Sequence, residues 1–499
     1  MMMFGTGPFI SIPFCLAATN PAGPHALIGY SIAAAGCMCD SLIWGELGSR
    51  FPESGGSYVY LRDCFGAEAW GKLAAFIYTW QFWITAPAEV ASGYIAISEY
   101  LVYIHGDSSY ATKSLTALGL LIPSIGMLCL GNGEIGKFVY VMWAVTLSAI
   151  AFVLIAGFAN FNSDNFQLPP QPFGDGTAGA TGAFIMSLGA ACRFGVYDFT
   201  GYYDVCQMGG EVEKPKRTIP GSCIITCACV LVIYILTYVS VIGYLPWYGP
   251  NGFVARVEAE EDSAAYIMGT FAETLAGRAF GIFFAIVVVI TIFGSVFSMF
   301  AGMIYLPGAA AQDGMFFSPF AKRSNMKYSK DRPLVSLLAI GGLSCAWCFF
   351  SLDTVIDAMT SMLVLVQFLG QAVGLCVLRH RIKKGTMPDD DDAFKVKCLP
   401  LVVTIQMVIF TFIYITTDNW LISGNDPILD LSILFLIVGV AVFFVWQKSK
   451  NEWPFNKASP PTKTVAVEAS ATAAESEDDM SKVNSSVNLL NMEGTTERA

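Results

Sequence analysis

The sequence predicts an all-α, polytopic membrane protein, and two observations support this fold class. Of the 499 residues, 55% are hydrophobic and only 13% are charged, and the mean hydropathy is +0.56. A soluble domain of this length could not bury so much apolar surface. The apolar residues also gather into windows of about 20 residues, the length at which a helix crosses a bilayer. We therefore expect one membrane domain over residues 1–447.

Twelve windows qualify as spans. In chain order they cover residues 5–19, 26–47, 67–103, 110–130, 135–160, 182–210, 220–245, 279–307, 333–351, 354–379, 396–417 and 428–447. The first window is short. The third is too long for one perpendicular crossing, so it must tilt strongly or run past the membrane surface.

The distribution of basic residues predicts the orientation. If the N-terminus is cytoplasmic, the outward loops hold only Lys113, Arg256 and Arg278, and all other Lys and Arg residues except the intramembrane Arg193 face the cytoplasm. The positive-inside rule then places both termini in the cytoplasm. Residues 448–499 are rich in Lys, Glu, Ser, Thr and Ala, which predicts a disordered cytoplasmic tail. We expect the plasma membrane as the location.

The residue pattern argues against an enzyme. The three histidines, His25, His105 and His380, lie far apart in the chain, and no grouping of Ser, His and acid supports catalysis. The fourteen cysteines lack metal-site spacing. No phosphate loop ending in Gly-Lys-Ser/Thr is present, so ATP-driven transport is not indicated. We expect no metal, no cofactor and no nucleic-acid partner.

Span six contains the most informative segment. Residues 193–204 place Arg193, Asp198, Asp204 and two glycines inside an otherwise apolar stretch. A charge at the bilayer centre costs about 2.5–3.5 kcal/mol on insertion scales, so these side chains are expected to face a cavity. A hydrophobic segment interrupted by glycine predicts a broken helix at a substrate site.

Span one contains a second predicted break, at Gly5-Thr6-Gly7-Pro8-Phe9. A helix that restarts after such a break directs free N–H groups and its positive end at the gap, which suits a carboxylate. Interrupted spans at positions one and six fit an inverted repeat of five plus five spans, with two extra spans at the end.

Four segments, in this order, resemble the amino acid, polyamine and organocation permease superfamily. They are the Gly5–Phe9 motif, GELGSRFPESGGSYVY at residues 45–60, DVCQMGGEVEKPKRTIP at residues 204–220 and AAAQDGMF at residues 309–316. The pattern covers residues 4–447 and is similar to the L-type amino acid transporters and the eukaryotic polyamine-uptake transporters. The resemblance implies a LeuT-like fold and alternating access, in which spans one, two, six and seven rock against the rest, driven by protons or by exchange.

The resemblance also implies residue roles. The backbone of Gly5, Thr6 and Gly7 would bind a substrate carboxylate, and an unwound part of span six around Val196 to Thr200 would hold an amino group. Tyr197 falls where relatives keep a gating aromatic residue, although a tyrosine in a span can also serve packing alone. The expected substrate-binding residues are Gly5, Thr6, Gly7, Val196, Tyr197, Asp198, Thr200 and Asp204.

The acidic residues bear on the substrate. Asp40, Glu89, Asp198 and Asp204 lie in spans, so as many as four carboxylates can approach one cavity with the single arginine Arg193. An excess of negative charge attracts cations, which favours a polyamine or a basic amino acid as substrate. Asp40, Glu89 and Asp198 are the candidates for attracting the cation or carrying a coupled proton.

Alternatives stay open at this point. Arg193 could pair structurally with Asp198 or Asp204, Glu46 and Glu211 could cap helices, and the substrate could then be a neutral amino acid. A nutrient sensor that binds amino acids without moving them is a further alternative.

Two departures from the superfamily pattern stand out. Only residues 1–4 precede the first glycine motif, where relatives have about half a span, so we expect either an upstream start or an inner gate that does not seal. Residues 104–113 hold no cysteine, which argues against a disulfide-linked heavy chain.

Overall fold

The computed structural model describes residues 3, 5, 7–66, 70–129, 135–174, 176–250, 252–259, 261, 264–324, 332–417 and 428–450. Their regular structure is helical, apart from an isolated β-bridge between Ser54 and Met208. The predicted tail lies outside the described residues from 451 onward.

Half of the α-helices that the structure describes are long. The longer ones are α2 (Ala26–Arg50), α4 (Trp70–His105), α5 (Tyr110–Cys129), α6 (Ile135–Ala159), α7 (Ala178–Phe199), α9 (Pro215–Tyr244), α12 (Arg278–Met303), α17 (Leu399–Thr417) and α18 (Ile428–Ser449). The shorter ones are α1 (Gly7–Ala17), α3 (Ser57–Phe65), α8 (Asp204–Gln207), α10 (Phe253–Glu258), α11 (Ile267–Ala276), α13 (Tyr305–Gln312), α14 (Leu334–Trp347), α15 (Leu352–Met362) and α16 (Leu369–Lys383). The structure also describes the short elements η1 (Ser163–Phe166), η2 (Gly209–Glu211), η4 (Ser318–Ala321) and the π-helical η5 (Leu363–Phe368).

Every predicted window contains a helix. Among the described residues, nine helical stretches are long and apolar enough to cross a membrane, and α1 and α14 are shorter apolar helices. The long third window is the 36-residue helix α4. At 1.5 Å per residue, α4 is about 54 Å long and exceeds a hydrocarbon core of about 30 Å.

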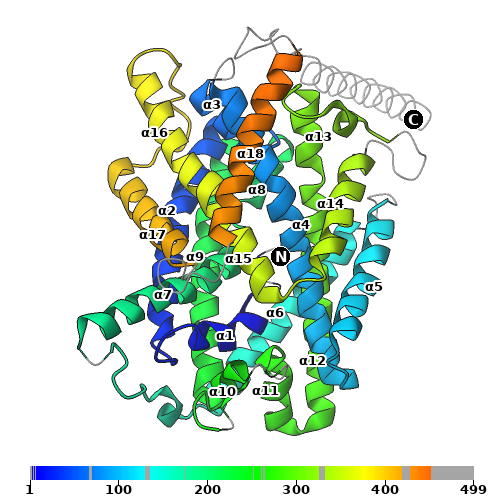
Figure 1. The fold of residues 1–499 in the computed structure, drawn as a ribbon, viewed down its shortest axis with the longest axis vertical. Coiled ribbons are helices and arrows are strands. Elements are labelled where there is room, and N and C mark those ends of the chain that lie inside the picture. Colours follow the sequence, from blue (N-terminus) through cyan, green and yellow to red (C-terminus); the bar gives the residue numbers. More distant parts are fainter. Residues whose placement is uncertain are drawn as a thin grey trace, which may run out of the picture.

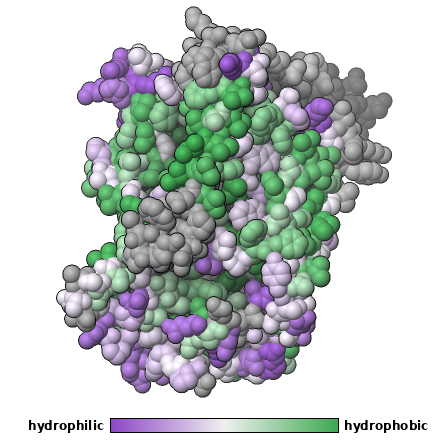
Figure 2. Space-filling view, in the orientation of Figure 1, coloured by the Kyte–Doolittle hydropathy of each residue, from purple (hydrophilic) through white to green (hydrophobic). Residues whose placement is uncertain are grey.

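The exposed surface indicates which environment surrounds the protein. Figure 2 shows a broad area of hydrophobic side chains, with hydrophilic side chains gathered toward the two ends of the molecule. Leu401, Val408 and Leu431 are examples of large apolar side chains that are exposed on α17 and α18. Apolar surface of this extent marks contact with lipid or with another protein. Together with the long apolar helices, it confirms the prediction of an all-α, multi-pass integral membrane protein.

The helices pack in two groups around the interior. α1, α2, α7 and α9 contact one another, whereas α4 packs against α3, α5, α12, α14, α15 and α18. Figure 1 shows α10 and α11 at one end of the molecule and α3 and α16 toward the other, with α1 lying in the interior. The candidate site lies between these two groups.

Span six is broken, but not where the sequence predicted. Val196, Tyr197 and Asp198 belong to the last turn of α7, and the interruption covers residues 200–203, before α8 begins. Gly201 has φ +108°, a conformation that side chains disfavour. Thr200 ends α7 and donates its hydroxyl to the Tyr197 carbonyl at 2.6 Å. The glycine therefore sets the break about one turn later than the predicted Val196–Thr200.

Span one has the expected helix start. α1 begins at Gly7, with Pro8 in its first turn, where a missing N–H is not needed. Tyr100 and Tyr234 donate hydroxyls to the carbonyls of Phe9 and Met3, so neighbouring helices hold this start in place. Thr6 lies outside the described residues.

Candidate substrate site

Asp198 lies at the centre of the interior and is held by hydroxyl groups. Its Oδ2 atom accepts hydrogen bonds from Ser11 (2.7 Å), Tyr30 (3.2 Å) and Tyr238 (3.3 Å). These donors come from α1, α2 and α9, so all four helices of one packing group meet at this carboxylate. Hydrogen bonds to charged groups stabilise by about 1.5–3 kcal/mol each.

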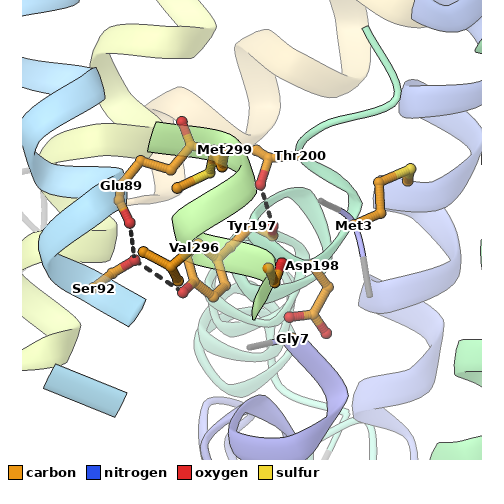
Figure 3. A pocket seen from close by; sticks show the side chains of 10 residues that line it. Met3, Gly7, Glu89, Ser92, Tyr197, Asp198, Thr200, Val296 and Met299 are labelled. Atoms are coloured by element: carbon orange, nitrogen blue, oxygen red, sulfur yellow. Dashed lines mark hydrogen bonds between the residues drawn. The ribbon is translucent and has the colours of Figure 1, made fainter. Parts of the chain in front are cut away.

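The other carboxylate oxygen faces a cavity. Asp198 is only 2% exposed, and its Oδ1 atom has no hydrogen-bond partner among the described residues. Gly7 lies beside it, because a Cβ atom built at this glycine would be 3.0 Å from Oδ1. Figure 3 shows Asp198 next to Gly7 at the edge of the cavity. A glycine at this position thus leaves room beside a buried carboxylate oxygen.

The cavity has a volume of about 30 Å³, enough for about two water molecules. Its lining comes from both packing groups and consists of Met3, Gly7, Glu89, Ser92, Tyr197, Asp198, Thr200, Ser295, Val296 and Met299. The Tyr197 hydroxyl lies 3.1 Å from Ser92 Oγ of α4, which ties the two groups together across the cavity (Figure 3).

The structure brings two of the four predicted carboxylates into this cavity, Asp198 and Glu89, and Glu89 is 8% exposed. Asp204 is half-buried, interacts electrostatically with Glu89 and accepts a hydrogen bond from Gln207, but does not line the cavity. Asp40 is fully buried elsewhere, where it accepts from Tyr202 (2.5 Å) and Gln406 (3.2 Å).

Two further predicted residues, Val196 and Gly5, do not line the cavity. Val196 is buried. Gly5 packs against α12, since a Cβ atom there would be 2.2 Å from Ser295 Oγ. That close approach brings the start of α1 against α12.

Arg193 does not pair with Asp198 or Asp204, so that expectation is wrong. Its guanidinium contacts Asp357 at 2.8 Å and Asp353 at 3.5 Å, both on α15. Five residues of α-helix rotate the chain by about 140° relative to the starting residue, so Arg193 and Asp198 face different neighbours. The sequence held a pattern that could have identified these partners, because Asp353 and Asp357 are four residues apart and share one helix face.

Glu46 does not cap a helix, so this alternative from the sequence is wrong. Its side chain is fully buried and accepts from Arg50 (3.2 Å), Arg379 (2.8 Å) and the Val396 N–H (2.8 Å). Arg379 is distant in sequence, so local pattern could not identify this partner. The side chain of Glu211 lies outside the described part of the structure.

The Glu46 cluster continues to the protein surface. Arg50 also donates to Asp389 at 2.9 Å, and Lys395 donates to the same carboxylate at 2.8 Å. These two hydrogen bonds, first from Lys395 and then from Arg50, lower the pKa of Asp389 to about 2. The acidic run at residues 389–392 is thus fastened to the end of α2.

Sequence reasoning missed the hydroxyl donors of Asp198. Ser11 follows Gly7 by one helical turn and so shares its face, which is a signal that could have been used. Tyr30 and Tyr238 are buried tyrosines within apolar windows, and nothing local separates them from packing residues. Within the described residues, no group of three or more His, Cys, Asp or Glu side chains could hold a metal ion.

Comparisons with known proteins agree with this architecture. The family model described as amino acid permease matches residues 1–466. The chain is 26% identical to a human (Homo sapiens) cystine/glutamate transporter over 479 residues, which covers 93% of this chain and 87% of that protein. It is 25% identical to a vacuolar cationic amino acid transporter 4 of Arabidopsis thaliana over 396 residues, covering 75% and 60% of the two chains. Because the family model spans most of the sequence, this multi-pass membrane protein belongs to the amino acid permease family.

Proposed function

We propose that the chain is a secondary active transporter of amino acids or polyamines that favours cationic substrates and couples their movement to protons. The observation that carries this proposal is the environment of Asp198. A buried carboxylate is costly unless it is paired, and here the partners of Oδ2 are neutral hydroxyls while Oδ1 faces the cavity. A substrate ammonium group would supply the missing positive charge.

The helix ends beside Asp198 supply complementary polarity. The N-terminus of α1, at Gly5-Thr6-Gly7, would receive a substrate carboxylate. The last-turn carbonyl groups of α7, from Val196 to Phe199, carry the negative end of that helix and favour an ammonium group. An amino acid could therefore align both of its charged groups between α1 and α7.

Proton coupling rests on the same cavity. Glu89 and Asp198 come from the two packing groups, and either carboxylate could hold a proton when no cation is present. Rocking of α1, α2, α7 and α9 against the other helices would separate the two carboxylates and expose the cavity alternately to the two sides of the membrane. Asp204, close to Glu89, adds to the negative field that attracts a cation.

The orientation follows from the basic residues. The helices α10 and α11 lie at one end of the molecule, and α3 and α16, which contain Arg62 and Arg379, lie toward the other (Figure 1). The positive-inside rule makes that end cytoplasmic, with both chain termini on the same side. We propose the plasma membrane as the location, which a fluorescently tagged full-length chain would test.

A neutral amino acid carrier is the second candidate. It is favoured by the α1 N-terminus, which suits the carboxylate common to all amino acids. In that case Asp198 would serve to hold α1, α2, α7 and α9 together. A sensor that binds without transport shares the same site and differs only in the absence of accumulation.

The test is uptake of labelled putrescine, arginine and leucine by cells that express the chain, with matched cells that lack it, at outside pH 5.5 and 7.5. Putrescine or arginine accumulation that rises at acid pH supports the proposal. Accumulation of leucine alone would replace it with the neutral carrier, and binding without accumulation would replace it with the sensor.

A further inference from the structure

A second chamber adjoins the cavity on the other side of Tyr197. It also has a volume of about 30 Å³ and shares Tyr197 with the first. Its walls are apolar, formed by Ile10, Phe14, Phe194, Leu352 and Ile356, except for Ser11 and Asp353. We call the chamber with Asp198 the inner chamber and the one with Asp353 the outer chamber.

The two chambers follow one another along α1. Gly7 lines the inner chamber, and Ser11 and Phe14 line the outer one. At 1.5 Å per residue, Ser11 and Phe14 are about 6 and 10 Å beyond Gly7 along the helix axis. Ser11 also donates to Asp198 at 2.7 Å, so the outer chamber extends from this carboxylate toward Phe14. A linear molecule with about five to eight covalent bonds between its ends is about 6–10 Å long and fits within this span.

The outer chamber carries an excess of negative charge. Among the residues that the structure describes, Arg193 meets two carboxylates, Asp357 at 2.8 Å and Asp353 at 3.5 Å, so one positive charge faces two negative ones there. Asp357 is the closer and more buried partner, with a side chain 12% exposed, whereas that of Asp353 is 60% exposed. Asp353 is therefore the carboxylate that a further cation can approach at little cost.

We propose that the substrate is a linear molecule with two positively charged groups, one held in the inner chamber at Asp198 and the other in the outer chamber at Asp353. This inference rests on the proposed function and adds the residue that selects for a second charge. The methylene chain between the charges lies against the apolar walls of the outer chamber. Each chamber alone is too small for such a molecule, so the Tyr197 ring must leave Ser92 and turn aside for it.

The test compares pairs of compounds that differ by one terminal ammonium group: lysine with norleucine, and putrescine with butylamine. Inhibition of labelled lysine or putrescine uptake gives the affinity of each compound in cells that express the full chain. We expect the doubly charged member to bind at least ten times more tightly, and Asp353→Asn to reduce this ratio about tenfold. Asp353→Glu should keep most of the ratio.

Asp107→Asn is the matched control. Asp107 lies in the connection between α4 and α5, and it does not line either chamber. Its loss should leave the ratio unchanged. An equal fall in Asp107→Asn and Asp353→Asn would overturn the proposal, because a general field would then explain the preference.

A series of diamines from ethylenediamine to octanediamine tests the spacing without any variant. The structure predicts the tightest binding at about five to eight bonds between the nitrogen atoms. Affinity without an optimum, or norleucine equal to lysine in a chain that still accumulates lysine, overturns the second site and leaves the proposed function standing. Failure to accumulate any cation overturns both.

Discussion

Two buried carboxylates in this protein are neutralised in different ways. Glu46, at the end of α2, is fully buried and contacts two guanidinium groups, those of Arg50 and Arg379. Asp198, in the last turn of α7, is 2% exposed and is bonded by three neutral hydroxyls, with one oxygen left facing a cavity.

The difference separates a structural acid from a candidate binding acid. The charge of Glu46 is balanced within the protein, so this residue can fasten α2, α16 and the segment before α17 permanently. The hydroxyls of Ser11, Tyr30 and Tyr238 orient Asp198 but leave its charge to be balanced by something that comes and goes. The chemistry of the partners, more than the depth of burial, distinguishes the two sites.

The largest expected effect comes from Glu46→Gln. Removing one partner of a buried ion pair leaves charge unbalanced and typically costs about 3–5 kcal/mol of folding free energy. We expect a marked fall in the amount of folded protein and in its melting temperature in detergent. Glu53→Gln is the control, because the Glu53 side chain is 67% exposed in its pair with Arg62, and such pairs contribute about 0–1 kcal/mol. Equal stability of the two variants would contradict the structural role of Glu46.

Asp198→Asn should change substrate selection instead of folding. Asparagine keeps one oxygen that can accept from the three hydroxyls but carries no charge. We expect kcat/KM for a cationic substrate to fall about 100-fold, or about 2.7 kcal/mol, with leucine much less affected. Uptake of both substrates is measured per folded molecule. Equal losses for both, or loss of folded protein, would place Asp198 with Glu46 as a structural residue.

Gly7→Ala tests whether the space beside Asp198 matters. The added methyl group would lie 3.0 Å from Asp198 Oδ1, where a ligand is proposed to bind, so we expect about a tenfold rise in KM. Gly221→Ala in α9 is the matched control, because nothing lies within 4 Å of the added atom. The idea fails if both variants transport equally well.

The smallest effect is expected at the surface end of the Glu46 cluster. The pKa of Asp389 is lowered to about 2 from an ordinary value of 3.8, so the fold favours its ionised form. This contribution to stability is therefore complete above about pH 4 and is lost as the pH falls toward 2. Because the group is exposed, the change should be slight.

Melting of wild-type protein and Asp389→Asn in detergent between pH 5 and 2.5 measures this contribution. The two curves should converge at the acid end. Asp392→Asn removes the same charge from a neighbouring exposed residue and should run parallel to the wild type. Parallel curves for Asp389→Asn would show that its pairing with Lys395 and Arg50 does not stabilise the fold.

By itself, the sequence determined the fold class and the approximate positions of the helices, and it predicted that span six is interrupted, although about one turn too early. Apolar windows reflect the thickness of the bilayer, and Gly201 acts through its own backbone conformation, so both signals are local. The tertiary structure decided the partners of the charges. Arg193 meets Asp357, Glu46 meets Arg379, and Asp198 meets Tyr30 and Tyr238, because packing brings together side chains that are 40 to 333 residues apart. Which buried acid is balanced within the protein, and which faces a cavity, depends on those distant contacts.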